Sequence, residues 1–118
     1  MLRPTIAAQT GFMNSHPSAI YEQFLIELER SGAAHDSLET SHARKRLNLE
    51  RETAKLLQLL ILTGSRRRVL EIGTSNGYSA LWLAAVLRRF PGACPLITVE
   101  RDSEKANQAR RNLAHVGL

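Results

Sequence analysis

An apolar run that breaks into a tight glycine turn and then resumes at helical spacing is the feature that most constrains this chain. It occupies Val69–Ser79, with the sequence V-L-E-I-G-T-S-N-G-Y-S. This order is typical of the βα unit that begins a nucleotide-binding fold. A second apolar run, residues 96–99, ends at Glu100, twenty-nine residues beyond Glu71. A carboxylate there can accept hydrogen bonds from both ribose hydroxyls. The two runs together predict a site for an adenosine-type cofactor.

The spacing of apolar residues predicts the other elements. Three helices should come first. The first is amphipathic, begins at Ser18 and ends at Ser31-Gly32. A mostly exposed helix follows over residues 36–47, with Asp36 as its cap, and then an apolar helix from Leu49 to a left-handed cap at Gly64. Two strand–helix units should follow, with strands over residues 68–72 and 95–99 and helices over residues 78–90 and 103–115. The order ααα-βα-βα places the chain in the α/β class.

The length of 118 residues allows one domain at most. We expect a flexible arm over residues 1–16, a helical segment over residues 17–64 and an incomplete parallel sheet with its helices over residues 65–118. Parallel sheets are normally covered on both faces and flanked by further strands. Here both strand edges would be open, so the isolated chain should be marginal, self-associating or bound to a partner. This favours a truncated fragment over an independent small module.

The net charge of +5 is unevenly distributed. Residues 1–63 carry seven basic and seven acidic side chains, whereas residues 64–118 carry nine and four. The excess comes from arginine clusters at the ends of apolar segments, where charges usually face solvent. No aromatic residues alternate with these arginines to stack on bases, which disfavours nucleic acid as a partner.

One cysteine, Cys94, excludes an intrachain disulfide and a cysteine-based metal cluster. No apolar run reaches the roughly 20 residues that span a bilayer, and no secretory signal is recognisable, so a cytoplasmic location without membrane contact is expected.

The turn after Ile72 is not built for a diphosphate. It contains no lysine, and Ser75 occupies the place of the second glycine in the dinucleotide fingerprint. Glu71 also puts a negative charge close to where phosphates would sit. A cationic or zwitterionic ligand fits better. An adenosine that carries an amino acid and a sulfonium would satisfy these features.

Residues 68–79 resemble motif I of the S-adenosylmethionine-dependent methyltransferases, and E-I-G-T-S-N-G-Y-S is similar to the O-methyltransferase branch that includes the catechol and caffeoyl-CoA enzymes. The resemblance covers roughly residues 18–118. It implies the N-terminal part of a class I, Rossmann-like methyltransferase fold, with S-adenosylmethionine as cofactor. It further implies methyl transfer to a hydroxyl of a small phenolic or catechol-like acceptor.

The resemblance also assigns roles within the predicted turn and strands. Gly73 would let the cofactor approach the turn closely, and Glu71 would contact the methionine amino group. Glu100 would accept hydrogen bonds from the ribose. Ser79 would bind the cofactor carboxylate, and Ser75 would lie against the cofactor.

Upstream of the turn, Asn48 and Leu49 match the family's segment that approaches the methionine end of the cofactor. Downstream, the family holds a divalent metal, expected to be Mg²⁺, on residues beyond its fourth strand, and the chain ends at Leu118 before that point. No catalytic or metal-binding residue is therefore assigned, the chain's status as an enzyme stays open, and negligible activity is expected from it alone.

Three alternatives remain. The complete protein is an O-methyltransferase of which this chain is the cofactor-binding half, or the chain is a non-catalytic cofactor-binding or interaction fragment. Less favoured is a nucleic-acid-associated methyltransferase, which only the arginine clusters suggest. Formation of a homo-oligomer is compatible with the first two.

Overall fold

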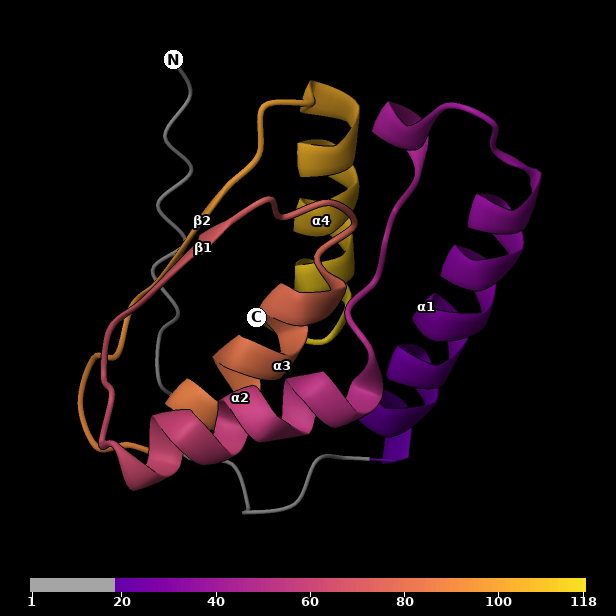
Figure 1. Cartoon of the computed structure of the whole chain (residues 1–118). Helices are drawn as coiled ribbons and strands as arrows, with labels where there is room; N and C mark the ends of the chain where they lie inside the picture. The colour runs from indigo at the N-terminus through magenta and orange to yellow at the C-terminus, as the bar shows by residue number, and fades with distance from the viewer. Residues whose placement is uncertain (1–18) are drawn as a thin grey trace.

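The computed structural model describes residues 19–118, so the predicted arm over residues 1–16 lies outside the described residues. The elements are α1 (Ala19–Leu38), the short 3-10 helix η1 (His42–Arg44), α2 (Arg51–Thr63), β1 (Val69–Ile72), α3 (Tyr78–Leu87), β2 (Leu96–Val99) and α4 (Ser103–His115). Figure 1 shows the two strands on one side of α3 and α1 on the other. The predicted α/β class and the Rossmann-like order of its βα units are confirmed.

Helix α3 is the centre of the molecule because its sequence is apolar on every side. All of its residues except Ser79 and Ala85 are buried. A helix of this kind must be surrounded by other elements. It contacts α1, α2, α4 and β2. Since the helix begins directly after the glycine turn, its burial also fixes the position of that turn.

The two strands are parallel and in register, with Val69 opposite Leu96 and Ile72 opposite Val99. Val69 and Leu96 pack against the buried residues of α3. The alternate positions face away from it and are 41–83% exposed: Leu70, Ile72, Ile97 and Val99. The prediction of buried strands is therefore correct for one face only, because no described element covers the other.

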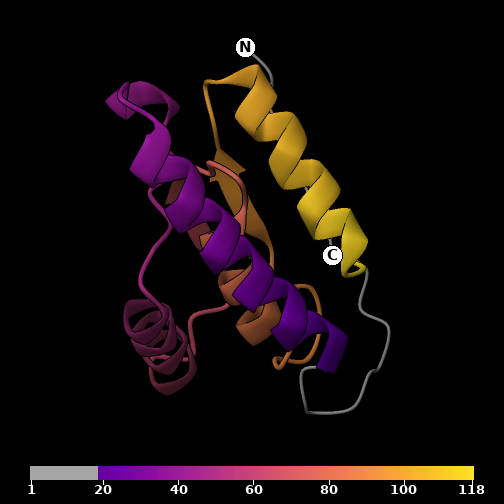
Figure 2. The ribbon, with the colours of Figure 1, turned by 90° about the vertical axis from the view of Figure 1, so that its right-hand side faces the viewer.

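Arg51 joins the first two helices to α3. Its guanidinium forms ion pairs with Glu22 and, at 2.8 Å, with Glu29 on α1. It also lies 5.3 Å from the centre of the Trp82 ring on α3. A planar guanidinium suits both partners because it can pair with carboxylates while stacking on an aromatic face. Figure 2 shows α1 running across the molecule in front of these elements.

The first helix is longer than predicted because Gly32 does not end it. Helix α1 continues to Leu38, and Gly32 is buried within it. A Cβ atom at Gly32 would lie only 2.5 Å from Nδ2 of Asn48. This glycine is therefore explained by the close approach of a distant side chain and not by a helix end.

The predicted helix over residues 36–47 is wrong. Asp36 belongs to the last turn of α1, and only η1 is helical in the rest of that stretch. The side chain of Asp36 does not cap a local helix, because it accepts hydrogen bonds from the main-chain N–H groups of Arg46 (2.7 Å) and Leu47 (2.8 Å). From the sequence alone, an aspartate that binds main-chain groups ten and eleven residues away cannot be distinguished from an aspartate that caps a local helix.

Several predicted ends shift by a few residues. Helix α2 begins at Arg51, and Gly64 has a φ of −85°, so the left-handed residue is Ser65, with a φ of 50°. Helix α3 ends at Leu87, before the predicted position 90. The bounds of α4 agree with the prediction. Its N-cap is Asp102, whose side chain accepts from the N–H groups of Glu104 and Lys105.

Candidate functional site

A groove of about 1160 Å³ opens beside the carboxyl end of β1 and the turn between β1 and α3. The carboxyl ends of parallel strands are where α/β proteins bind their ligands. All seven residues that the sequence predicts for the cofactor line this groove: Asn48, Leu49, Glu71, Gly73, Ser75, Ser79 and Glu100. Residues that are 52 positions apart in sequence are therefore brought to one place.

The two glycines of the turn have different roles. Both have a positive φ, 94° at Gly73 and 86° at Gly77. A Cβ atom at Gly73 would meet nothing within 4 Å, whereas one at Gly77 would lie 3.1 Å from Cβ of Ala109 on α4. Gly73 therefore leaves space on the side of the groove, and Gly77 lets the turn pack against α4.

Glu71 lies at the centre of a chain of hydrogen bonds under the groove. One carboxylate oxygen accepts from the hydroxyl of Ser79, and the other accepts from Oγ1 of Thr98 at 2.5 Å. Thr98 in turn lies 2.5 Å from the hydroxyl of Thr74. Burial raises the pKa of Glu71, against the two hydrogen bonds, which lower it. A positively charged group near this carboxylate would lower the free-energy cost of keeping it ionised.

Glu100 closes the turn from the end of β2. One of its oxygens accepts from the N–H group of Ser75 at 2.8 Å, and the other accepts from that of Asp102 at 2.9 Å. Each carboxylate oxygen has two lone pairs, so both can still accept a hydrogen bond from a ligand. The main-chain N–H of Gly73 also donates to the carbonyl of Val99 at 2.8 Å, which holds the ends of the two strands together.

The segment of residues 45–48, which we call the strap, forms part of the groove's wall. The hydroxyl of Ser75 donates to the carbonyl of Arg46 at 2.7 Å, which ties the turn to the strap. The side chain of Asn48 donates to the carbonyl of Leu28 at 3.0 Å and so is turned to α1. Leu49 packs against the core. These contacts leave the predicted cofactor roles of Ser75, Asn48 and Leu49 as predictions.

Four polar residues of this region were missed from the sequence: Thr74, Thr98, Asp36 and Lys105. Thr98 lies within an apolar run, where a threonine is expected to be an ordinary strand residue, and Thr74 lies in the turn, where its partner on β2 is distant in sequence. The amine of Lys105 donates to the carbonyls of Ala43 and Lys45, each at 2.8 Å. Those partners lie about sixty residues away, so no local pattern could reveal them.

Comparison with known proteins gives the family. The model of the O-methyltransferase family matches residues 16–118. That range is most of the chain. The chain belongs to the O-methyltransferase family.

The chain is 41% identical over 64 residues to a catechol O-methyltransferase of Niastella koreensis, a match that covers 54% of this chain and 28% of that protein. It is 42% identical over 65 residues to a protein-L-isoaspartate O-methyltransferase of Marinobacter nauticus, covering 55% of this chain and 26% of that protein. A solved O-methyltransferase from Bacillus cereus, in complex with SAH, superposes with a TM-score of 0.60 at 31% identity, over 80% of this chain and 38% of that one. The chain therefore matches less than a third of the length of these curated relatives.

The described residues do not offer a metal centre. No group of three or more His, Cys, Asp or Glu side chains among residues 19–118 is placed to hold an ion. The Mg²⁺ that the resemblance implies has no ligands here, so no step of the chemistry is assigned to it. Within the same described part of the chain, no helix is long and apolar enough to cross a membrane.

Proposed function

We propose that the groove binds S-adenosylmethionine, and that the complete protein transfers the cofactor's methyl group to a hydroxyl of a small aromatic compound. The observation that carries this proposal is the pair of carboxylates, Glu71 within β1 and Glu100 directly after the parallel strand β2, which line the same groove as the open position at Gly73. A diphosphate placed between these two carboxylates would meet two negative charges, whereas a positively charged group placed there would be attracted.

The ligand's parts have complementary groups in the groove. When bound, the cofactor would supply an activated methyl group on a sulfonium. Glu71 would face the positive end of the ligand, and Glu100 would accept from the ribose hydroxyls. The chain's own contribution is to bind and orient the donor, which lowers the barrier by fixing the geometry of attack. The acceptor class rests on the likeness to catechol O-methyltransferases.

The role of Glu100 is tested by comparing two ligands. We expect Glu100→Gln to weaken S-adenosylhomocysteine binding about tenfold, because a hydrogen bond to a charged acceptor contributes about 1.5–3 kcal/mol. The same change should hardly affect an analogue that lacks both ribose hydroxyls. Isothermal titration calorimetry measures both affinities.

Glu104→Gln is the matched control, since Glu104 is an exposed carboxylate four residues further on. It should leave both affinities unchanged. An equal loss for the two ligands in Glu100→Gln would show that this carboxylate acts only by bracing the Ser75 and Asp102 amides. That result, or no loss at all, would reject the ribose contact.

A further inference from the structure

The strap has no regular secondary structure, yet side chains from three different elements hold its main chain. Asp36 of α1 accepts from the N–H groups of Arg46 and Leu47. Ser75 of the turn donates to the carbonyl of Arg46, and Lys105 of α4 donates to that of Lys45. Four successive polar groups of this segment are thus bonded to distant side chains.

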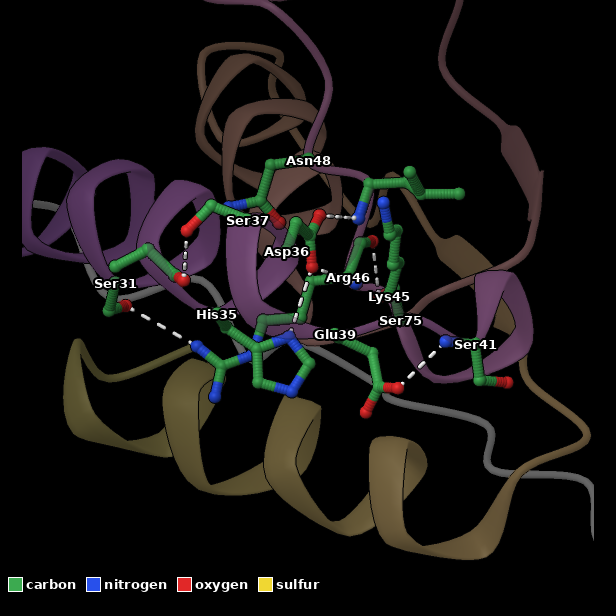
Figure 3. Close-up of polar contacts among 12 residues, drawn as sticks. Ser31, His35, Asp36, Ser37, Glu39, Ser41, Lys45, Arg46, Asn48 and Ser75 are labelled. Carbon is green, nitrogen blue, oxygen red and sulfur yellow. Dashed lines mark hydrogen bonds and ion pairs between the residues drawn. The ribbon is translucent and has the colours of Figure 1, made fainter.

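The strap is also held in a costly conformation. Leu47 has a φ of 49°, in the left-handed region that residues other than glycine rarely adopt. Such a conformation persists only where the surroundings hold it. The two hydrogen bonds to Asp36 are on Leu47 and its neighbour, so they act at the strained position. Figure 3 shows the carboxylate of Asp36 directed at the main chain of Arg46.

Asp36 lies behind the strap, whereas Lys105 lies at the groove itself. The groove is lined by all four strap residues and by Lys105, but Asp36 is not among its lining residues. Asp36 is therefore able to affect a ligand only through the strap. Its carboxylate is also bonded to Nδ1 of His35 at 3.0 Å. Burial acts to raise the pKa of Asp36, but the hydrogen bonds from Arg46, His35 and Leu47 lower it to about 2. The carboxylate is thus charged at neutral pH.

We infer that Asp36 and Lys105 are positioning residues that clamp the strap, Asp36 at the Arg46 and Leu47 N–H groups and Lys105 at the Lys45 carbonyl, and so hold the upstream wall of the cofactor groove in its binding shape. This inference rests on the proposed function and extends it to residues outside motif I. Without the clamp, the strap samples other conformations, and the ligand binds only the fraction in which the wall is correctly placed. The apparent dissociation constant rises by the inverse of that fraction.

Two variants each remove one side of the clamp. Asp36→Asn keeps the size of the side chain but replaces one acceptor oxygen with a donor. Lys105→Met keeps the length of the side chain but removes the hydrogen bonds to the carbonyls of Ala43 and Lys45. We expect each to raise the dissociation constant of S-adenosylhomocysteine about tenfold. Lys105→Arg should recover most of the affinity, because a guanidinium can again donate to two carbonyls.

Hydrogen exchange separates positioning from general destabilisation. In Asp36→Asn, we expect faster exchange of the Arg46 and Leu47 amides, with little change of protection in α3. A merely structural role would instead lower protection throughout the core. Glu39→Gln and Lys55→Met are the matched controls, because the Glu39 carboxylate accepts from the nearby N–H group of Ser41 and Lys55 is exposed on α2. Both should bind like the unmodified chain.

The outcomes distinguish the two proposals. No uptake of S-adenosylhomocysteine by the unmodified chain would contradict the proposed function. Uptake by the unmodified chain with full affinity in Asp36→Asn and Lys105→Met would overturn the clamp alone. A loss of affinity that Lys105→Arg fails to recover would also count against it, since the effect would then belong to the lysine as a direct ligand contact.

Discussion

Gly73→Ala should abolish the uptake of S-adenosylhomocysteine while the chain stays folded. The added methyl group meets no protein atom within 4 Å, so it projects into the open side of the turn, where the ligand must approach. The φ of 94° makes alanine unfavourable by roughly 1–2 kcal/mol, which a folded domain tolerates. Affinity is measured by calorimetry, and folding by circular dichroism.

Gly117→Ala is the matched control for this change. Gly117 also has a positive φ, 72°, and a Cβ atom there would likewise meet nothing within 4 Å. It lies after α4 and does not line the groove. The control therefore carries a similar backbone penalty without blocking the site. Equal affinities for Gly73→Ala, Gly117→Ala and the unmodified chain would mean that the ligand does not pass over Gly73.

Gly77→Ala should have the largest effect on folding. Its new Cβ atom would lie 3.1 Å from Cβ and 3.2 Å from Cα of Ala109, and main-chain atoms of a packed helix move little. The contact adds about 1–3 kcal/mol of overpacking to the cost of roughly 1–2 kcal/mol for a φ of 86°. We expect a loss of about 2–5 kcal/mol in the free energy of unfolding, measured by urea denaturation.

A second substitution isolates the contact. Ala109→Gly removes Cβ, the nearest of the atoms that the new methyl group would meet, and leaves the Cα at 3.2 Å, so Gly77→Ala should cost less in that background than in the unmodified chain. The difference should be about 1 kcal/mol or more, as expected for residues in direct contact. Equal costs in the two backgrounds would show that the contact with the Ala109 Cβ does not contribute to the loss.

The parts of the fold that follow from local patterns were predictable from the sequence. The bounds of α4 agree because a capping residue and a terminal glycine mark its two ends. The turn at Gly73 was identifiable because an apolar run, glycines and a helical period occur in succession. The family assignment, which rests on this same segment, is confirmed by the family match over residues 16–118.

The parts that depend on distant contacts were not predictable. Asp36 appeared to be a helix cap because its real partners are ten and eleven residues away. Gly32 appeared to end a helix because the side chain that packs on it, Asn48, is distant in sequence. The hydrogen bond between Glu71 and Thr98 could not be predicted either, because each residue lies in a separate apolar run. Only the pairing of β1 with β2 places those two residues opposite each other.

Equilibrium dialysis of the 118-residue chain against S-adenosylhomocysteine and against NAD tests the central claim most directly. If the two carboxylates and the glycine turn form a site for an adenosine that carries a zwitterionic amino acid, S-adenosylhomocysteine should bind saturably, and NAD should neither bind nor displace it. Saturable binding of NAD, together with no binding of S-adenosylhomocysteine, would contradict this claim.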